Sequence, residues 1–322
     1  MPGGSGAIFR NSFAGAMLLL ALAVVPARSY ASDTIVVVPT RTGGIYQEFI
    51  RSFENSLQQN KGEKPVSIRI VEASSLSGEK SSELFGDVRL FVTVGTSAAQ
   101  KVLNINPPVP VLNTLIPRSS YDHMVATTPR GNTSSIFLDQ PLTRRLELVE
   151  NILPTRKMIS VVLGPTTRDL KDELVTVAFG RGMRLRVETM SAGQGLVGPL
   201  NRALEDSDAF LAVADPVVSN RRTVQNLLLT TYRQRVPVIA YSKAYVKAGA
   251  LAAVYSTPEQ IGRQTGELVA ELVRTGSRSL PKPQYPKYFS VEINDQVAQS
   301  LGIRVPSASY IERRLRMREV TP

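Results

Sequence analysis

The chain has 322 residues, of which 43% are hydrophobic and 20% charged, a composition typical of a globular protein long enough for two domains. It contains no cysteine and only one histidine, His123, which excludes disulfides, thiolate chemistry and zinc sites built on Cys or His. The formal net charge of +11 suggests anionic partners, but the basic residues are scattered and no nucleic-acid-binding motif accompanies them. We therefore expect no nucleic-acid partner.

The first residues have the pattern of a secretory signal. Arg10 is the only charged residue before an apolar stretch at residues 13–25, and Pro26 ends that stretch. Ser29 and Ala31 then place small residues at the −3 and −1 positions of a cleavage site. We expect a cleavable signal peptide over residues 1–31 and a free, periplasmic mature protein. An uncleaved anchor is the alternative.

The following chain alternates strand-like and helix-like patterns. In its first half the expected strands are 34–39, 66–71, 90–94, 109–115 and 135–138, with helices at 45–59 and 98–103, a polar region at 72–87 that can hold a short helix, and an irregular stretch at 116–132. In the second half they are 158–163, 184–189, 209–213, 236–240 and 250–255, with helices at 142–153, 168–181, 197–205 and 219–233. Such alternation with short turns predicts parallel sheets covered on both faces. The expected fold class is therefore α/β, with two doubly wound, Rossmann-like lobes.

The remaining chain contains a helix from Thr257 to Arg274, a Pro-rich connector, a strand at 288–293 and a helix that begins at Asp295. We expect this segment to pack back onto the first lobe. The expected domains are residues 32–137 plus about 257–306 for lobe 1, residues 138–256 for lobe 2, and a basic C-terminal tail over 307–322. The chain would then cross between the lobes about three times and form a hinge.

The turns at the carboxyl ends of the expected strands are the candidate ligand site, because open α/β sheets bind ligands there. In lobe 1, Thr40 begins the turn after the first strand, and Gly95, Thr96 and Ser97 lie between a strand and a helix. Gly95 permits close backbone approach, and the two hydroxyls at a helix N-terminus suit a carboxylate. An ordinary helix start is the structural alternative for this turn.

The candidate residues of lobe 2 are Thr166, Thr167, Asp215, Tyr241 and Ser242. The two threonines can bind an anion, and Asp215 can receive an ammonium group or cap the helix that follows Pro216. Tyr241, like Tyr46 in lobe 1, can stack on a planar ligand or pack in the core or rim. Arg41 and Lys243 are the nearest basic residues, and exposed charges are the alternative reading for both.

The order of several motifs resembles a known family. The residues that carry the resemblance are Gly95-Thr96-Ser97-Ala98-Ala99, Gln140-Pro141, Leu163-Gly164-Pro165, Asp215-Pro216-Val217-Val218-Ser219, Lys247-Ala-Gly-Ala-Leu251, Gly262-Arg263-Gln264 and Val291-Glu-Ile-Asn294. The chain resembles the ABC transporter substrate-binding proteins of the type I periplasmic-binding-protein fold, in particular the subgroup that binds aromatic amino acids. It departs from the family at residues 116–121, where an Asp-Pro pair is usual, and at Ser134, where glycine is usual.

This resemblance implies a non-enzymatic protein that captures an amino acid, or a similar zwitterion or anion, between two lobes and delivers it to an inner-membrane ABC permease. The alternative is a periplasmic sensor or adaptor that signals to a membrane partner. We expect no enzyme, because the chain has no Gly-x-Ser-x-Gly elbow, no metal-ligand cluster and no Walker lysine motif. We also expect a monomer without cofactor or metal.

Overall fold

The computed structural model describes residues 1, 3–4, 33–76, 87–128, 131–155 and 157–320. The chain divides into two units, Met1–Ala31 and Ser32–Pro322. The expected signal peptide lies outside the described residues, apart from residues 1, 3 and 4, and so does most of the polar region at 72–87. Within the described part, no helix is both long and apolar enough to cross a membrane.

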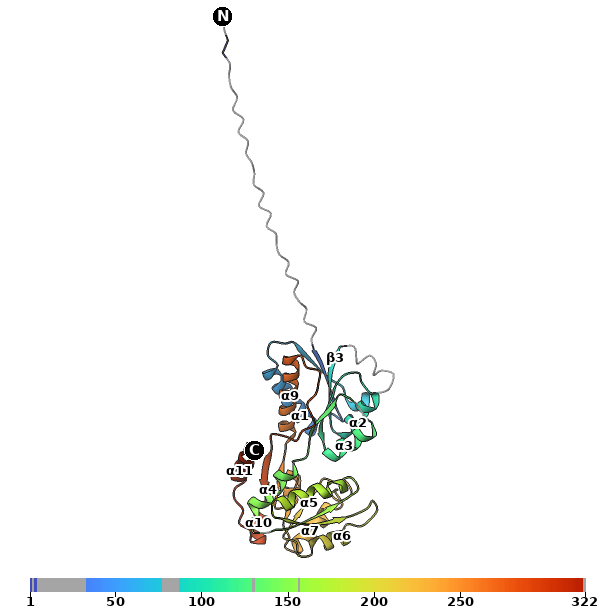
Figure 1. Ribbon diagram of the computed structural model, residues 1–322, viewed down its shortest axis with the longest axis vertical. Helices are drawn as coiled ribbons and strands as arrows, with labels where there is room; N and C mark the ends of the chain where they lie inside the picture. Colours follow the sequence, from blue (N-terminus) through green and yellow to red (C-terminus); the bar gives the residue numbers. More distant parts are fainter. Residues whose placement is uncertain (2, 5–32, 77–86, 129–130, 156, 321–322) are drawn as a thin grey trace. The chain divides into compact units, whose positions relative to one another are not determined.

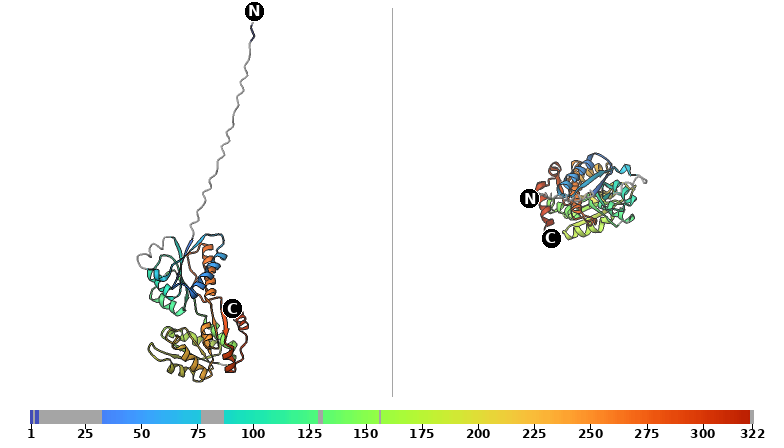
Figure 2. Two further views of the ribbon diagram at one scale, coloured as in Figure 1. Left: turned by 180° about the vertical axis from the view of Figure 1, so that it is seen from behind. Right: turned by 90° about the horizontal axis from the view of Figure 1, so that it is seen from above.

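The second unit contains two lobes, each built on one sheet (Figure 1, Figure 2). The sheet of lobe 1 is entirely parallel and has the order β2-β1-β3-β4-β5. Its strands are β1 (Asp33–Pro39), β2 (Val66–Ile70), β3 (Val88–Val94), β4 (Val111–Ile116) and β5 (Thr133–Phe137). The β-branched, fully buried residues of β1 show why this strand is central, since both of its faces are covered.

Four helices cover the sheet of lobe 1. On one face, α1 (Gly44–Asn60) and α9 (Pro258–Thr275) pack their apolar stripes against alternate residues of β1 and β3. On the other face lie α2 (Thr96–Ile105) and α3 (Arg118–Thr127). The short 3-10 helix η1 (Ala73–Ser75) precedes β3. The helix α3 falls where we expected an irregular stretch; its few buried residues, Tyr121 and Met124, give it a weak apolar period, which explains why the prediction was wrong.

The sheet of lobe 2 has the order β11-β10-β9-β8-β6-β7, and only β11 runs antiparallel. Its strands are β6 (Met158–Leu163), β7 (Arg184–Thr189), β8 (Ala209–Leu211), β9 (Val238–Ala240), β10 (Ala252–Tyr255) and β11 (Ser290–Ile293). One face is covered by α4 (Leu142–Ile152), η3 (Arg168–Leu170), α5 (Lys171–Gly180), α10 (Asp295–Leu301) and α11 (Ala308–Val320). The other face is covered by α6 (Val197–Leu204), α7 (Val224–Arg233) and α8 (Lys243–Lys247).

The end of the chain belongs to lobe 2, so our assignment of residues 288–306 to lobe 1 was wrong. The strand β11 pairs with β10, which would otherwise be an open edge, and Phe289 and Val291 fill the core of lobe 2. The expected basic tail is the helix α11, which buries Ile311 and Leu315 in the same core. Two of its arginines form ion pairs, Arg316 with Glu312 at 2.7 Å and Arg318 with Glu150 at 3.1 Å.

Two helix starts also differ from the expectation. The helix expected from Ser219 begins at Val224, because the chain first turns around Asp215 and Asn220. The cap of α10 is Asn294 and not Asp295, since the Asn294 side chain accepts a hydrogen bond from the Val297 N–H at 3.1 Å. The start of α9 is as expected, with Thr257 and Gln260 forming a reciprocal capping box.

Three crossover segments connect the lobes: the chain leaves lobe 1 after β5, returns after β10, and leaves again after α9. The third crossover runs beside β5, where Gln284 bridges Ile136. The Gln140 side chain on the first crossover donates to the Ser256 hydroxyl on the second at 2.8 Å. The three crossovers are therefore held together by hydrogen bonds.

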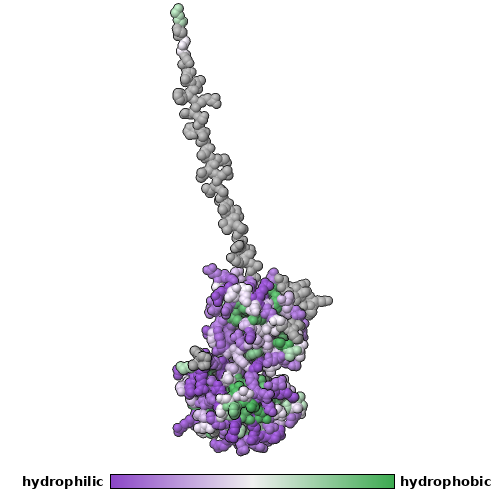
Figure 3. Space-filling model, viewed as in Figure 1, coloured by the Kyte–Doolittle hydropathy of each residue, from purple (hydrophilic) through white to green (hydrophobic). Residues whose placement is uncertain are grey.

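The surface of lobe 2 has an apolar area over α5 (Figure 3). Val175 is 43% and Phe179 82% exposed there, whereas Leu174 and Ala178 of the same helix are buried. The helix thus packs with one apolar stripe and leaves a second one to solvent.

Candidate functional site

The predicted turn of lobe 1 is tied together by Thr40. Its hydroxyl donates to the Val94 carbonyl at 3.1 Å and accepts from the Ala98 N–H at 3.3 Å, so a side chain after β1 caps the helix that follows β3. Gly95 lies beneath it with φ +97°, and a Cβ there would be 2.7 Å from the Thr40 Oγ1 and 3.2 Å from the Tyr46 ring. This position therefore requires glycine for both conformation and space.

Thr96 and Ser97 are exposed on the first turn of α2, and neither side chain caps the helix. Both residues follow the end of β3 and so lie at the carboxyl end of the lobe 1 sheet. Close by, the Arg41 guanidinium lies over the Tyr46 ring at 5.7 Å. Of the four candidates in lobe 1, the structure thus makes Thr40 and Gly95 part of the turn's framework and leaves Thr96 and Ser97 accessible.

In lobe 2, Asp215 gathers the predicted residues around itself. One carboxylate oxygen accepts from the Thr166 N–H at 3.1 Å, the Thr166 hydroxyl at 2.7 Å and the Thr167 hydroxyl at 3.1 Å. The other accepts from the backbone N–H groups of Val217 and Val218 at 2.8 and 3.3 Å. The residue is 1% exposed, and a Cβ on Gly164 would lie 2.2 Å from its Oδ1. Of the two roles considered for Asp215, the geometry favours the structural one.

Tyr241 and Ser242 follow β9 on the same side of the lobe 2 sheet. The Ser242 hydroxyl accepts from the Tyr245 N–H at 3.3 Å and caps α8, so it is used by the fold. Tyr241 is half-buried and meets Tyr245 edge to face at 5.4 Å. Burial raises the pKa of both tyrosines, that of Tyr245 to about 12. Lys243, the other basic candidate of this turn, pairs with Glu292 at 3.3 Å.

A pocket where the crossovers meet was not predicted. It encloses about 420 Å³ including its open mouth. Its walls come from both lobes and from two crossovers: Arg118, Ser119, Asp139, Gln140, Leu142, Arg145, Thr167, Leu170, Val213, Ala214 and Tyr285. Of the residues that we predicted for the site, only Thr167 lines this pocket.

Charged groups dominate the polar wall of this crossover pocket. The Asp139 carboxylate accepts a hydrogen bond from the Arg118 N–H, and burial raises the pKa of Asp139 although Arg145 and Arg118 oppose the shift. Arg118 itself donates to the Tyr285 hydroxyl at 2.8 Å and to Glu173 of lobe 2 at 2.9 Å. The pocket therefore has an acidic and a basic side, with a lobe-to-lobe ion pair beside it.

Arg145, on α4, supplies the buried basic group. Burial lowers the pKa of Arg145 to about 10, and the Asp139 carboxylate opposes this shift, so the guanidinium remains charged at neutral pH. Arg145 was missed because we counted it only among the scattered basic residues, although the spacing of the apolar residues around it contains the signal. It lies three residues after Leu142 and four before Val149, on the buried face of the helix. A charged residue at such a position calls for a partner or a ligand.

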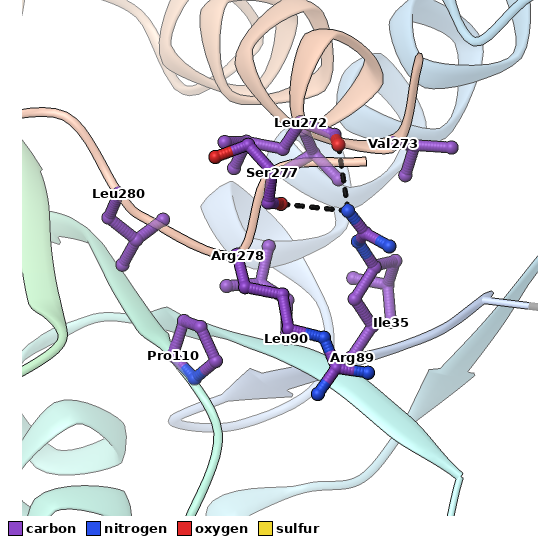
Figure 4. Close-up of a pocket in the computed structure, with 10 residues that line it drawn as sticks. Ile35, Arg89, Leu90, Pro110, Leu272, Val273, Ser277, Arg278 and Leu280 are labelled. Atoms are coloured by element: carbon purple, nitrogen blue, oxygen red, sulfur yellow. Dashed lines mark hydrogen bonds between the residues drawn. The ribbon is translucent and has the colours of Figure 1, made fainter. Parts of the chain in front are cut away.

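A second pocket, of about 240 Å³, lies in lobe 1 (Figure 4). Arg89 is its main polar group, and its guanidinium pairs with Asp33 at 3.0 Å and donates to the carbonyls of Leu272 and Ser277. These residues lie near the amino ends of β1 and β3, the edge opposite to the one that binds ligands in open α/β sheets. This pocket is therefore a structural junction between α9 and the sheet.

No His, Cys, Asp or Glu side chains gather into a group that could hold a metal ion within the described ranges.

Comparison with known proteins places these features in context. A family model described as ABC transporter substrate binding protein matches residues 82–312. A tyrosine-binding protein of Clostridioides difficile is 24% identical over 236 residues, which cover 69% of this chain and 66%, just under two thirds, of that protein.

Two solved structures have the same arrangement of lobes. A ligand-free, open substrate-binding protein with adhesive properties from Clostridium difficile has a TM-score of 0.66 and 18% identity, covering 85% of this chain and 96% of that one. An ABC domain from Streptococcus pneumonia in complex with L-Trp has a TM-score of 0.60 and 17% identity, covering 87% and 97%. At these identities the likeness concerns the fold, which is the type I periplasmic-binding-protein architecture.

Proposed function

Because the chain belongs to the ABC transporter substrate-binding protein family, we propose that it captures an aromatic amino acid and delivers it to an inner-membrane ABC permease. The ligand class is supported by the tyrosine-binding relative. The relatives are binding proteins, which agrees with a non-enzymatic role. The observation that carries the proposal is the crossover pocket, because its walls come from both lobes and an occupant would contact both.

The proposed site differs from the predicted one in its division of roles. Thr96 and Ser97 are exposed at the carboxyl end of β3, and we retain them as ligand contacts together with Tyr241. Thr166 is exposed as well, but its hydroxyl and N–H donate to Asp215, so it belongs to the residues that shape the turns. Thr40, Gly95, Thr167, Asp215 and Ser242 shape the turns that present those contacts. Arg145 and Asp139 are added from the crossover pocket.

A ligand screen on the purified protein tests this function. Because a ligand that binds only the folded state stabilises it, one present at 100 times its Kd adds about 2.7 kcal/mol to the free energy of unfolding. We expect L-tyrosine, L-tryptophan or L-phenylalanine to raise the melting temperature, and nucleosides, sugars and dicarboxylates to leave it unchanged. If no aromatic amino acid stabilises the protein or binds in calorimetry, the proposed function is wrong.

We further propose that the protein is exported to the periplasm as a monomer after cleavage behind Ala31. Mass spectrometry of the periplasmic protein would then find Ser32 at the N-terminus. Retention of residues 1–31 in that fraction would contradict the cleavable signal and favour the uncleaved anchor.

A further inference from the structure

Two consecutive arginines of α4, Arg144 and Arg145, are both buried but have very different surroundings. Arg144 is 4% exposed and satisfied on every side: it donates to Glu319 at 2.8 Å, to the Pro286 carbonyl at 2.9 Å and to Gln140, and its guanidinium lies 4.1 Å from the Phe289 ring centroid. Such a complete set of partners makes Arg144 a structural residue, which ties α4 to the third crossover and to α11.

Arg145 is 7% exposed, yet its partners are few. One terminal nitrogen donates to the Ala212 carbonyl, and the Nε–H is buried without a hydrogen-bond partner among the described residues. No carboxylate of the described chain lies within ion-pair distance of it, in contrast to Arg144. A buried guanidinium with an unused donor is costly unless another group completes its hydrogen bonds.

The missing group has room in the crossover pocket, which Arg145 lines. Asp139 lines the same pocket, close enough for its carboxylate to favour the charged form of Arg145. The polar groups of Tyr241 and Tyr285 are also close to the guanidinium. The pocket thus presents one buried cation, one acid and the aromatic residue Tyr285 to an occupant.

We propose that Arg145 anchors the carboxylate of the bound ligand through its Nε–H and the adjoining edge of the guanidinium. This inference rests on the proposed function and assigns the residue that recognises the ligand's acidic end. A carboxylate is the matching acceptor because it is planar, charged and able to accept two parallel hydrogen bonds from one guanidinium.

The neighbouring Asp139 restricts the ligand further. A second negative charge on the ligand would lie beside this carboxylate and be repelled, whereas an ammonium group would be attracted. The pocket therefore favours a zwitterionic α-amino acid over a dicarboxylate, and a deaminated acid should bind more weakly than the amino acid.

Three related probes separate these contributions in calorimetry: L-tyrosine, its deaminated acid 3-(4-hydroxyphenyl)propanoate, and its decarboxylated amine tyramine. Wild-type protein should bind L-tyrosine most tightly, the acid more weakly, and tyramine at least about 30-fold more weakly than L-tyrosine. L-tryptophan and its corresponding analogues are measured in parallel, in case the larger ring is preferred.

Three variants then test the residue. Arg145→Gln should weaken binding of the preferred amino acid about 30-fold or more while tyramine binding changes little. Arg145→Lys should recover part of the loss, because it restores the charge but not the planar donor pair. Arg184→Gln, at an exposed position of β7, removes the same charge and should bind like wild type.

These measurements distinguish failure of the carboxylate assignment from failure of the proposed function. If wild type binds the amino acid and Arg145→Gln binds it equally well, or if tyramine binds as tightly as L-tyrosine, the carboxylate assignment is wrong and the proposed function stands. If wild type binds none of L-tyrosine, L-tryptophan and L-phenylalanine, the proposed function and the carboxylate assignment are both wrong. If Arg145→Gln does not fold, the carboxylate assignment is tested by the order of the three probe affinities for wild type and by the affinity of Arg145→Lys.

Discussion

Asp215 and Asp139 are both acids that follow a parallel strand, but the fold uses them in opposite ways. Asp215 follows β8, is 1% exposed and accepts five hydrogen bonds from its own loop and the loop after β6. Asp139 follows β5, accepts the Arg118 N–H, and lines a pocket opposite a buried guanidinium. The acid that the sequence motif emphasised holds a turn together, and the other acid is the one a ligand can reach.

The hydrogen bonds of a polar residue at such a site therefore separate a structural role from a ligand-binding role. A side chain whose lone pairs or protons are already used within the lobe, such as those of Thr40, Thr167 and Asp215, keeps the turn in shape. A side chain that faces a pocket or solvent with unused capacity, such as that of Arg145, is available. The following predictions test this division, in order of decreasing effect.

The largest effect should come from Asp215→Ala. It leaves the Thr167 hydroxyl and the Val218 N–H buried without an acceptor, so we expect the free energy of unfolding to fall by about 3 kcal/mol or more. Asp139→Ala should cost no more than about 1 kcal/mol, because that carboxylate holds fewer donors. Urea denaturation measures both free energies of unfolding. Equal losses for the two variants would contradict the assignment of Asp215, but not Asp139, to a structural role.

Tyr245 and Tyr241 provide the second comparison. Burial raises the pKa of Tyr245 to about 12, against about 10 in the unfolded chain. Its contribution to stability is therefore complete below pH 10 and is lost as the pH rises toward 12, with about 1.4 kcal/mol gone at pH 11. Denaturation between pH 9 and 11 should show a shallower loss for Tyr245→Phe than for wild type.

The matched control is Tyr232→Phe, since Tyr232 is 48% exposed and should leave the slope of wild type unchanged. A slope for Tyr245→Phe as steep as that of wild type would mean that Tyr245 titrates like an exposed tyrosine.

The hydroxyls of lobe 1 provide the third comparison. Thr40→Ala removes the group that caps α2 and should lower the free energy of unfolding by about 1 kcal/mol. The double variant Thr96→Ala, Ser97→Ala should change stability by less than about 0.5 kcal/mol and weaken amino-acid binding by about 5-fold, the loss of one ordinary hydrogen bond. If this double variant weakened amino-acid binding as much as Arg145→Gln does, the ligand's carboxylate would bind at this turn and not at Arg145.

The smallest effect concerns the ion pair between the lobes. The side chains of Arg118 and Glu173 are 34% and 38% exposed, so both are more than one third exposed. A double-mutant cycle with Arg118→Gln and Glu173→Gln should therefore give a coupling energy below about 1 kcal/mol, smaller still at high salt. A coupling energy above about 2 kcal/mol would show that an exposed arginine ion pair stabilises the protein strongly, which would contradict the distinction drawn between exposed Arg118 and buried Arg145.

Much of the fold could be predicted from the sequence, because most strands and helices, α3 excepted, carry a clear apolar pattern of their own. The β3–α2 turn and the start of α9 at Thr257 were recognised in this way. The sequence does not show which strand β11 pairs with, because its apolar pattern fits any sheet. Its position is determined by pairing with the open edge of β10. The expectation of a basic tail failed for the same reason, since Ile311 and Leu315 reveal α11 only once lobe 2 is there to cover them.

The site was less accessible to sequence reasoning. Whether Asp215 binds a ligand depends on the loop 49 residues earlier, whose Thr166 occupies one of its oxygens. The crossover pocket depends on Tyr285 and Arg118 approaching across 167 residues of chain. Arg145 alone left a local signal, as a charge on the apolar face of α4.

The most direct test of the central claim is a crystal structure of the protein with the amino acid that binds most tightly. We expect a ligand carboxylate oxygen within about 3 Å of the Arg145 Nε, with the ammonium group toward Asp139 and contacts from both lobes. A carboxylate bound at Thr96 and Ser97, with the Arg145 Nε–H still unpaired, would contradict it.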